Sequence, residues 1–237
     1  MTATKTEQPR IVSETEWLEE RKKLLIREKE FTRLGDRLSA EKRKLPWVKV
    51  EKEYVFNGLE GKENLAELFA GRSQLIVYHF MFGPDWEEGC PVCSMVADNF
   101  DANVVHLAHR DVSLVAVSRA RLSQIEAFKN RMGWKFKWVS SYENEFNHDY
   151  RVSFTDDDVA RGNYYNFDTS GFPSEEAPGL SVFYKDENGN IFHTYSCYAR
   201  GGEFLIGPYS YLDLAPKGRD EAGLPFTMAW VRHHDRY

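Results

Sequence analysis

Residues 74–82, QLIVYHFMF, form a nearly unbroken apolar run, and residues 112–117 form a second one. A strand that faces solvent on one side alternates apolar and polar residues, so a continuous run is typical of a strand buried on both faces, as in a parallel sheet. Helical patterns lie between the runs, at about residues 90–109, and after them, at residues 121–132. With a further strand pattern at residues 136–139, this order predicts an α/β domain with parallel pairing and right-handed crossovers.

The first helical segment opens with two cysteines three residues apart, in Cys90-Pro91-Val92-Cys93. A thiol at a helix N-terminus lies near backbone N–H groups that lack helical partners and near the positive end of the helix dipole. Both favour the thiolate and lower the pKa of the thiol. One helical turn brings the second sulfur within reach of the first, so the spacing allows a disulfide that forms and is reduced again. These are the parts of a dithiol redox site.

Composition excludes several classes of protein. The formal net charge of −6 argues against nucleic acid as the main partner, and no apolar run approaches the ~20 residues of a membrane span. The N-terminus is polar and lacks the hydrophobic segment of a signal peptide. Three cysteines in such a chain indicate a reducing compartment, where Cys-x-x-Cys is by default catalytic or metal-binding. We therefore expect a cytoplasmic protein.

Residues 13–44 are expected to form a helical arm that Pro46 ends. Ser13 followed by Glu16 fits a capping box, and Gly35 allows a bend in the middle. Apolar residues recur every seven positions, so the helix has an apolar stripe that packs either on its own domain or on a second copy of the chain. The residues of this heptad pattern are Trp17, Leu24, Phe31, Leu38 and Leu45.

The segments on either side of the α/β pattern are also strand-rich. Residues 47–56 alternate as a half-exposed strand would, and an Asn57-Gly58 turn and a short helix at residues 62–69 follow. Residues 140–178 are polar, aromatic and irregular, so we expect an insertion there. After it, LSVFYK and NIFHTYSCY joined by DENGN form the clearest hairpin, because Asn-Gly turns match the twist of paired strands.

This order of parts resembles the thioredoxin superfamily, in particular its peroxiredoxin and periplasmic-reductase-like branch. The stretch LEGKENLAELFAGRSQLIVYHFMFGPDWEEGCPVC is similar to that branch's lead-in, SRARLSQIEAFKNRMGWKFKWVSS to its next crossover, and APGLSVFYKDENGNIFHTY to its terminal hairpin. The resemblance implies a thioredoxin-like central sheet flanked by helices. It also implies a cis-proline before the hairpin strand that faces the cysteine pair, and Pro178 matches that position.

Nearly end to end, the chain is similar to a bacterial family known as domain of unknown function 899. The likeness is carried by EKEFTRLGDRLSAEKRKLPWV, FMFGPDWEEGCPVCSMVADNFD, YSYLDLAPKGRDE and WVRHHDRY. Members are commonly labelled predicted dithiol-disulfide oxidoreductases. The resemblance therefore implies thiol–disulfide exchange but names no substrate.

Within the motif, Cys90 is the expected nucleophile, because the outer position at a helix N-terminus is more exposed and better stabilised as thiolate. Cys93, one turn further in, would resolve the mixed disulfide. Pro91 suits the first helical turn, where its missing N–H costs nothing, and Val92 completes the spacer. Trp86, in the preceding loop, either shields the thiols from solvent or packs at the base of the loop.

A peroxidase is the nearest alternative, since a proline follows Cys90 as it follows the catalytic cysteine of peroxiredoxins. Those enzymes normally carry threonine or serine three residues before the cysteine, where this chain has Glu87. A carboxylate beside the thiolate would raise the pKa of the thiol, which opposes peroxidase chemistry. Otherwise, Glu87 and Glu88 are solvated loop charges or a proton relay for dithiol exchange.

A non-catalytic binding protein on a thioredoxin-like scaffold is the third alternative, because a fold does not determine a function. The cysteine pair would then hold a metal together with Cys197 and a histidine. Alternation along the strand places Cys197 on one face with His193 and Tyr195. The sequence has no second cysteine pair at zinc-ribbon spacing, which argues against a metal, and Cys197 is then a small buried apolar side chain.

Other conspicuous residues have ordinary explanations. His79, inside the apolar run, is expected to be a hydrogen-bonded core histidine. Adjacent residues diverge in direction, so His233, His234 and Asp235 are expected to form a hydrogen-bonded tail rather than a metal site. Arg200-Gly201-Gly202 lacks the strand-then-helix context of a phosphate loop.

We therefore predict a helical arm at residues 1–45 and a thioredoxin-like α/β domain at residues 46–237, with an insertion before its final hairpin. The expected function is thiol–disulfide exchange between a disulfide-bearing substrate and a cellular dithiol donor. This chemistry requires no organic cofactor, metal, nucleic acid or membrane. A homodimer through the arm is one arrangement that the heptad pattern leaves open.

Overall fold

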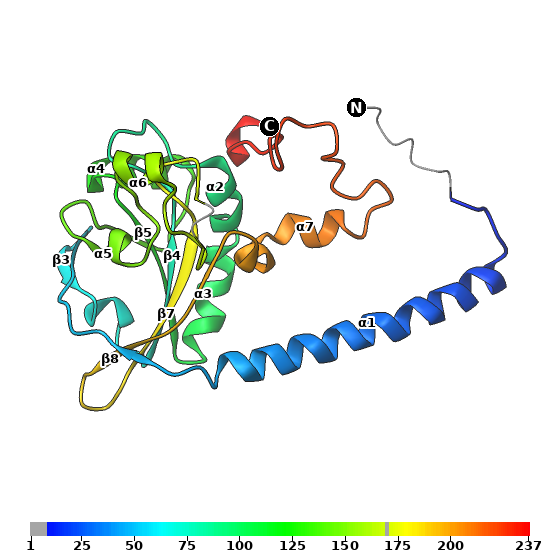
Figure 1. Cartoon of the computed structure of the whole chain (residues 1–237), viewed down its shortest axis with the longest axis horizontal. Helices are drawn as coiled ribbons and strands as arrows, with labels where there is room; N and C mark the ends of the chain where they lie inside the picture. Colours follow the sequence, from blue (N-terminus) through cyan, green and yellow to red (C-terminus); the bar gives the residue numbers. More distant parts are fainter. Residues whose placement is uncertain (1–8, 169–170) are drawn as a thin grey trace. The chain divides into compact units, whose positions relative to one another are not determined.

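A computed structural model describes residues 9–168 and 171–237 of the chain. The chain divides into two compact units, Met1–Pro46 and Trp47–Tyr237. The first contains the long helix α1 (Glu14–Lys42), and the second contains an eight-stranded sheet flanked by helices (Figure 1). Most of the polar N-terminal stretch noted in the sequence lies outside the described residues.

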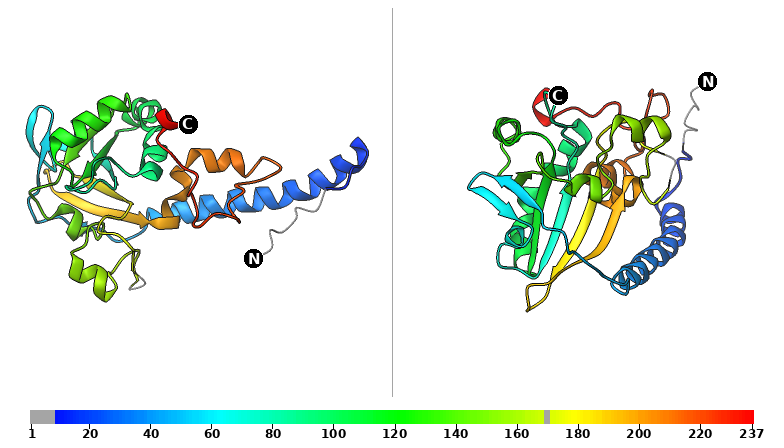
Figure 2. Two further views of the ribbon diagram at one scale, coloured as in Figure 1. Left: turned by 90° about the horizontal axis from the view of Figure 1, so that it is seen from above. Right: turned by 60° about the vertical axis from the view of Figure 1, so that its left-hand side comes forward.

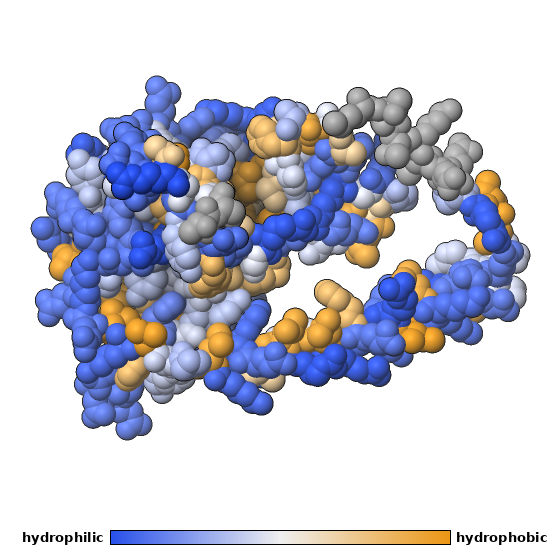
Figure 3. All heavy atoms as spheres, viewed as in Figure 1, coloured by the Kyte–Doolittle hydropathy of each residue, from blue (hydrophilic) through white to orange (hydrophobic). Residues whose placement is uncertain are grey.

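The helix α1 is continuous over 29 residues although Gly35 lies near its middle. Ser13 is its N-cap, and the Ser13 hydroxyl accepts a hydrogen bond from the Glu16 backbone N–H at 3.3 Å. The helix buries none of its side chains. Trp17 and Phe31 of the heptad pattern are 57% and 77% exposed, and Figure 3 shows apolar residues gathered along the helix. The homodimer through this stripe stays a prediction.

The sheet of the second unit has the strand order β1-β8-β7-β4-β5-β6-β2-β3. Strand β4 pairs in parallel with β5, and β5 with β6, whereas β4 pairs antiparallel with β7 on its other side. Figure 2 shows β7 and β8, in yellow and orange, side by side beyond β4. The strands are β1 (Val48–Lys49), β2 (Val55–Gly58), β3 (Gly61–Asn64), β4 (Gln74–His79), β5 (Val112–Ser118), β6 (Lys137–Ser140), β7 (Gly179–Lys185) and β8 (Ile191–Tyr198).

Helices make both parallel crossovers. The chain passes from β4 to β5 through α2 (Pro91–Ala97) and α3 (Phe100–Ala108), and from β5 to β6 through α4 (Leu122–Arg131). The cysteine-bearing helix thus follows the central strand, and an antiparallel hairpin flanks that strand, so the predicted thioredoxin-like α/β fold is confirmed. The single helix expected at residues 90–109 is two helices, because Asp98 caps the first and its carboxylate accepts a hydrogen bond from the Trp134 indole at 2.9 Å.

The hairpin of β7 and β8 is confirmed, but its register contains a bulge. Val182 lies opposite Tyr195, whereas Phe183 lies opposite His193, so β8 has one extra residue between them. Side chains alternate along a strand, and the extra residue therefore turns His193 to the face opposite that of Tyr195 and Cys197. The prediction that His193 shares a face with Cys197 is wrong for this reason.

The segments before β4 also differ from their predictions. Residues 47–56 do not form one strand, because β1 pairs at one edge of the sheet and β2 lies near the other. The charged residues 51–53 separate them. The turn falls at residues 59–60 rather than at Asn57-Gly58, and the expected helix is β3 followed by the 3-10 turn η1 (Glu67–Phe69). Segments this short have too little periodicity to separate helix from strand.

The sheet is buried on both faces. One core lies on the face covered by α2, α3 and α4 and includes Tyr78 and Phe128. The core on the opposite face includes Val77 of β4 and Phe69 of η1. Neighbouring residues of β4 thus alternate between two cores, which is why its sequence is apolar without a break.

The insertion contains the short helices α5 (Phe146–Asp149) and α6 (Asp156–Arg161). A third core joins it to the end of β8; its residues are Val152, Phe154, Tyr165, Ala177 and Tyr198. The tail after β8 runs through η2 (Ala199–Leu205), α7 (Gly207–Leu212) and η3 (His234–Arg236). Within the part of the chain that the structure describes, no helix is both long and apolar enough to cross a membrane.

Candidate functional site

Cys90 lies where the loop after β4 enters α2. It is the N-cap of that helix, with Pro91 as the first helical residue, as predicted. The Cys90 backbone N–H donates to the Met81 carbonyl at 3.0 Å, which ties the loop to the end of the central strand. Gly89 has no room for a side chain, since a Cβ there would lie 2.6 Å from the Phe80 ring. The sequence Gly-Cys-Pro therefore holds the half-buried Cys90 at the helix start.

The two thiols of the motif are inequivalent. The pKa of Cys90 is lowered to about 7, chiefly because the Cys93 thiol donates a hydrogen bond to its sulfur. Burial opposes this shift, and the backbone N–H groups of Cys93 and Val92 add to it. These amides belong to the first turn of α2, where helical partners are lacking. The lowered pKa favours the Cys90 thiolate, which is the reactive form.

Cys93 is only 1% exposed, and burial raises its pKa well above that of an ordinary thiol. The negative charge of Cys90 raises it further, whereas the Tyr78 hydroxyl donates a hydrogen bond to the Cys93 sulfur and lowers it. Tyr78 itself is 5% exposed on β4. The sequence analysis missed this tyrosine, although alternation along the strand directs it to the helix-covered face.

A cavity of about 410 Å³ opens beside the cysteine pair, and both cysteines line it. Val92 and other apolar residues of α2 form one wall, and the first residues of β7 and the last of β8 form another. Residues 226–228 of the tail also contribute. No Asp, Glu, Lys, Arg or His is among the described residues that line it. Its size lies within the roughly 300–1,000 Å³ typical of ligand pockets.

Pro178 lines this cavity together with Cys90 and Cys93, so the chain brings it to the cysteine pair as expected. The predicted cis peptide bond is wrong, since residues 9–168 and 171–237 contain none. The extended chain here is held by the Ala177 N–H, which donates to the Val152 carbonyl at 2.8 Å. On the other side of Pro178, its carbonyl accepts a hydrogen bond from the Tyr165 hydroxyl at 2.5 Å.

Trp86 and Glu87 are not among the residues that line the cavity of the thiols. The Trp86 ring packs on Gly83, where a Cβ would come within 2.9 Å of it, and the Trp86 carbonyl accepts a hydrogen bond from Gln124. Trp86 therefore packs at the base of the loop. Glu87 is exposed to solvent, so its carboxylate is not part of the cavity that the thiols line.

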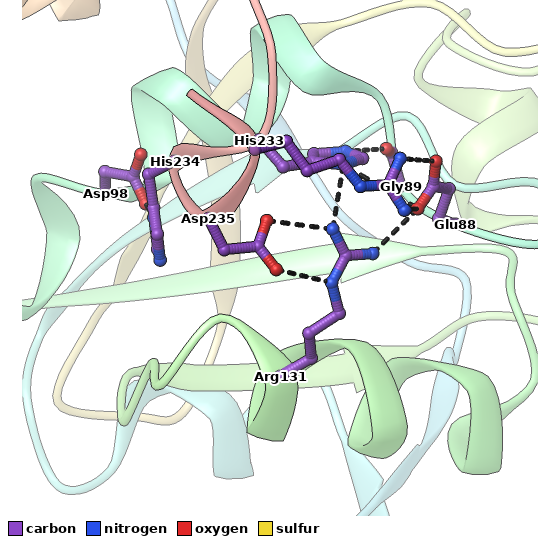
Figure 4. Close-up of polar contacts among 8 residues, drawn as sticks. Glu88, Gly89, Asp98, Arg131, His233, His234 and Asp235 are labelled. Atoms are coloured by element: carbon purple, nitrogen blue, oxygen red, sulfur yellow. Dashed lines mark hydrogen bonds and ion pairs between the residues drawn. The ribbon is translucent and has the colours of Figure 1, made fainter.

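The C-terminus binds the cysteine loop at Glu88 and Gly89 (Figure 4). Arg236 forms two hydrogen bonds to Glu88, at 2.7 and 2.8 Å. Arg131 of α4 donates to Glu88 at 2.7 Å and, through two nitrogens, to Asp235 at 2.8 and 2.9 Å. The ring nitrogen Nε2 of His233 donates to the Gly89 carbonyl at 2.8 Å. We call these five side chains the C-terminal latch: Glu88, Arg131, His233, Asp235 and Arg236.

The latch shows what the adjacent tail residues do. His233 is 2% exposed, whereas His234 turns away and its Nδ1 contacts the Asp98 carboxylate at 2.6 Å. His233 and Asp235 both contact Arg131, whereas His234 contacts Asp98, so the His-His-Asp run is a hydrogen-bonded tail. Within the described ranges, no group of three or more His, Cys, Asp or Glu residues is placed to hold a metal ion.

Cys197 and His79 have separate surroundings. Cys197 is 5% exposed and lines the same cavity as the cysteine pair, whereas the Nε2 atom of His193 contacts the Ser196 hydroxyl at 2.8 Å on the other face. The Nε2 atom of His79 contacts the Ser181 hydroxyl at 2.9 Å, but its Nδ1 atom has no hydrogen-bond partner. His79 is therefore only half satisfied, and burial lowers its pKa to about 3, which keeps the ring neutral.

Solved structures with a similar fold share little sequence with this chain. Peroxidoxin BcpB from Mycobacterium tuberculosis is 10% identical, with a TM-score of 0.46, over 68% of this chain and 94% of that one. Peroxiredoxin Q from Xanthomonas campestris is 12% identical, with a TM-score of 0.45, over 68% and 90%. The mitochondrial 2-Cys peroxiredoxin from Plasmodium falciparum is 14% identical, with a TM-score of 0.41, over 73% and 94%.

Comparison with curated proteins gives no match. One family model, described as "Bacterial protein of unknown function (DUF899)", matches residues 6–237. That range includes the helix α1, the cysteine motif and the C-terminal latch. The chain therefore belongs to the DUF899 family, as its resemblance in sequence implied.

Proposed function

We propose that this protein is a thiol–disulfide oxidoreductase in which Cys90 is the nucleophile and Cys93 the resolving thiol. The observation that carries the proposal is the inequality of the two thiols. The pKa of Cys90 is lowered to about 7 and that of Cys93 is raised, and both line one cavity. A nucleophile near its pKa at neutral pH, backed by a protonated thiol, is suited to disulfide exchange.

The reaction has two displacements. The Cys90 thiolate forms a bond to one sulfur of the substrate disulfide, and the other sulfur leaves as a thiolate. Cys93 passes its proton to the departing thiolate, and its sulfur attacks the Cys90 sulfur, which releases the second substrate thiolate. The substrate gains two electrons and the enzyme ends as a Cys90–Cys93 disulfide. A cellular dithiol donor then returns the two electrons, so this chemistry needs no organic cofactor.

Tyr78 supports the second displacement. Cys93 must lose its proton in an apolar site, where burial opposes the charge. The Tyr78 hydroxyl donates to the Cys93 sulfur and is therefore placed to stabilise the attacking thiolate. Tyr78 would then be a positioning and hydrogen-bonding residue for resolution, with little effect on the first attack.

Two features of Glu87 bear on the peroxidase alternative, one against it and one in its favour. The position three residues before Cys90 is the exposed Glu87, so no hydroxyl lies there to orient a peroxide. Since Glu87 also lies outside the cavity, its carboxylate does not line the thiol site. The alternative of a metal-binding scaffold needs a histidine beside Cys197, and His193, which was expected on the same strand face, lies on the opposite one.

The decisive test is a count of reactive thiols. The reduced protein is oxidised with diamide, and free thiols are labelled with a maleimide and counted by mass spectrometry. We expect two of the three thiols to be lost on oxidation and recovered with dithiothreitol. Cys197→Ser is the matched control and should lose the same two thiols. A protein that keeps all its thiols, or that loses Cys197 first, contradicts the proposal.

The order of the two cysteines is tested by trapping. Cys93→Ser should accumulate a mixed disulfide at Cys90, whereas Cys90→Ser should accumulate none. Peroxide consumption that survives Cys93→Ser but not Cys90→Ser would instead favour a peroxidase. Stoichiometric zinc in the protein as purified would favour the metal-binding scaffold.

Two further expectations complete the proposal. Reversible use of cysteines suits a reducing compartment, so we propose a cytoplasmic enzyme. The heptad pattern of α1 leads us to propose a homodimer through this helix. Light scattering at several concentrations tests the dimer, and a monomer throughout would reject it.

A further inference from the structure

We propose that the substrate of the Cys90–Cys93 pair carries a neutral, apolar aliphatic group, and that this group fills the cavity when the thiolate attacks. The inference rests on the proposed function and names its substrate class. Small aliphatic disulfides would be preferred over charged thiol compounds and over protein disulfides.

The first argument is the lack of charge around the cavity. None of its described lining residues is ionised at neutral pH apart from the Cys90 thiolate itself. Arg200 and Glu203 are next in sequence to the lining residues Ala199 and Gly202, but they do not line the cavity and they pair with each other. Glu88, two residues before Cys90, pairs with arginines of the latch. A ligand carboxylate that entered the cavity would lose its hydration and find no cationic side chain there.

The second argument is that several polar groups of the walls are already engaged. The Tyr78 hydroxyl donates to Cys93, and the Tyr198 hydroxyl donates to the Tyr150 carbonyl at 3.0 Å. Tyr165, from the insertion, donates to the Pro178 carbonyl and accepts from the Ala199 N–H at 3.0 Å. These groups stabilise the walls, and a ligand that enters gains mainly apolar contact.

The third argument is the shape of the site. The cavity has a volume of about 410 Å³ and receives Phe226 and Met228 from the tail, so it is walled by parts of the chain far apart in sequence. A protein disulfide would have to enter with its flanking backbone, whose N–H and C=O groups need hydrogen-bond partners. An alkyl chain has no polar groups that need hydrogen-bond partners. The cavity therefore fits an aliphatic tail better than a polypeptide.

The test uses alkyl 2-pyridyl disulfides with chains from methyl to hexyl. Attack of Cys90 on the alkyl-bearing sulfur releases pyridine-2-thione, which is followed by absorbance. Rates of the full-length protein are corrected for the residual rate of Cys90→Ser and divided by those of 2-mercaptoethanol. We expect the rate constant to rise about threefold to fourfold per added methylene until the cavity is full. A probe of equal length that ends in a carboxylate should react at least about tenfold more slowly.

Three variants locate the effect. Phe226→Lys adds a cation at the cavity wall, where Phe226 is 67% exposed, and should speed the carboxylate probe severalfold. Phe204→Lys is the matched control, because Phe204 is 64% exposed and does not line the cavity; it should change neither probe. Leu205→Trp fills part of the cavity, so the rise with chain length should stop at a shorter chain.

The outcomes separate this inference from the proposed function. If Cys90 reacts no faster than the free thiol and no Cys90–Cys93 disulfide follows, the proposed function fails. If the disulfide forms rapidly but the rate is independent of chain length, or the carboxylate probe is equally fast, only the substrate class fails. Turnover of insulin disulfides with a kcat/KM above that of the hexyl probe would also overturn the substrate class.

Discussion

The loop that carries Cys90 separates two surroundings of opposite character. On one side lies the uncharged cavity, lined by Cys90, Cys93 and apolar residues. On the other lies the C-terminal latch, in which Glu88 and Asp235 pair with two arginines. One side can select what reaches the thiolate, and the other holds the loop in place.

The reactivity and the order of this short loop have different physical sources. Close hydrogen bonds within the motif lower the pKa of Cys90, and they act over a few ångströms in a site shielded from salt. Among the charged latch side chains, Arg131 is 30%, Glu88 34% and Arg236 51% exposed, so solvent screens their charges. We therefore expect the latch to affect stability and the motif to affect reactivity.

The largest effect should be that of pH on the alkylation of Cys90. With a pKa of about 7, the thiolate fraction rises with pH and levels off above the pKa. The rate with iodoacetamide should thus increase roughly a hundredfold between about pH 5 and pH 8. Mass spectrometry of the Cys90 peptide gives the rate in the wild-type protein. If Arg131→Ala raised the midpoint of this pH profile by about half a pH unit or more, the latch would contribute to the lowered pKa of Cys90. That result would contradict the assignment of the latch to stability alone.

The second effect is the cost of breaking the latch. Arg131→Ala removes the hydrogen bonds to Glu88 and Asp235, and we expect it to lower the free energy of unfolding by about 1–2 kcal/mol, within the range for charge-assisted bonds that are partly exposed. Arg232→Ala is the matched control, since Arg232 is an exposed tail arginine that bonds only to backbone carbonyls in the hydrogen bonds described. Urea unfolding compares them. If the two variants lose equal free energy of unfolding, the latch has no specific role in stability.

The third effect concerns Tyr78, on the cavity side. Tyr78→Phe removes the hydrogen bond to Cys93, so resolution of the mixed disulfide should slow about fivefold to tenfold, as for the loss of one ordinary hydrogen bond of about 1 kcal/mol. The first attack by Cys90 should change little. Stopped-flow measurement of the two displacements separates them. A slower first attack with unchanged resolution would reject the role assigned to this tyrosine.

The smallest effect is that of salt. At about 1 M sodium chloride the screening length falls to about 3 Å, so the contribution of the latch to stability should shrink by less than about 1 kcal/mol. The increase in rate with alkyl chain length should persist, because burial of apolar groups does not weaken with salt. Loss of the chain-length effect at high salt would show that charge, not apolar contact, governs the cavity.

Much of the central fold was predictable because it depends on local patterns. The run at residues 74–82 needs two apolar faces, and its strand, the cysteine helix after it and the β7–β8 hairpin are all present. The elements that differ are short or depend on pairing. β1 and β2 lie on opposite sides of the sheet, and a bulge reverses the direction of His193, because hydrogen bonds to neighbouring strands decide both.

The candidate site divides in the same way. The motif predicts Cys90 at a helix start, with Cys93 one turn inside, because helix geometry is local. The cavity-wall residues of β7, β8 and the tail come from distant segments, and no spacing in the sequence connects them to the cysteines. Tyr78 lies on the strand before the motif, where alternation indicates its face but not its contact with Cys93. Pro178 was matched to the cavity by resemblance, but its cis peptide bond was not found.

Periodicity and capping act within a few residues, so the sequence alone predicts a dithiol pair at the junction of a buried strand and a helix. The surroundings of that pair depend on the tertiary fold. Apolar walls come from β7, β8 and the tail, and charged groups of α4 and the C-terminus pair behind the loop. These groups come together through long-range packing. The apolar walls determine access to the Cys90 thiol and the charged groups hold its loop, whereas the pKa of the thiol depends on the local helix start.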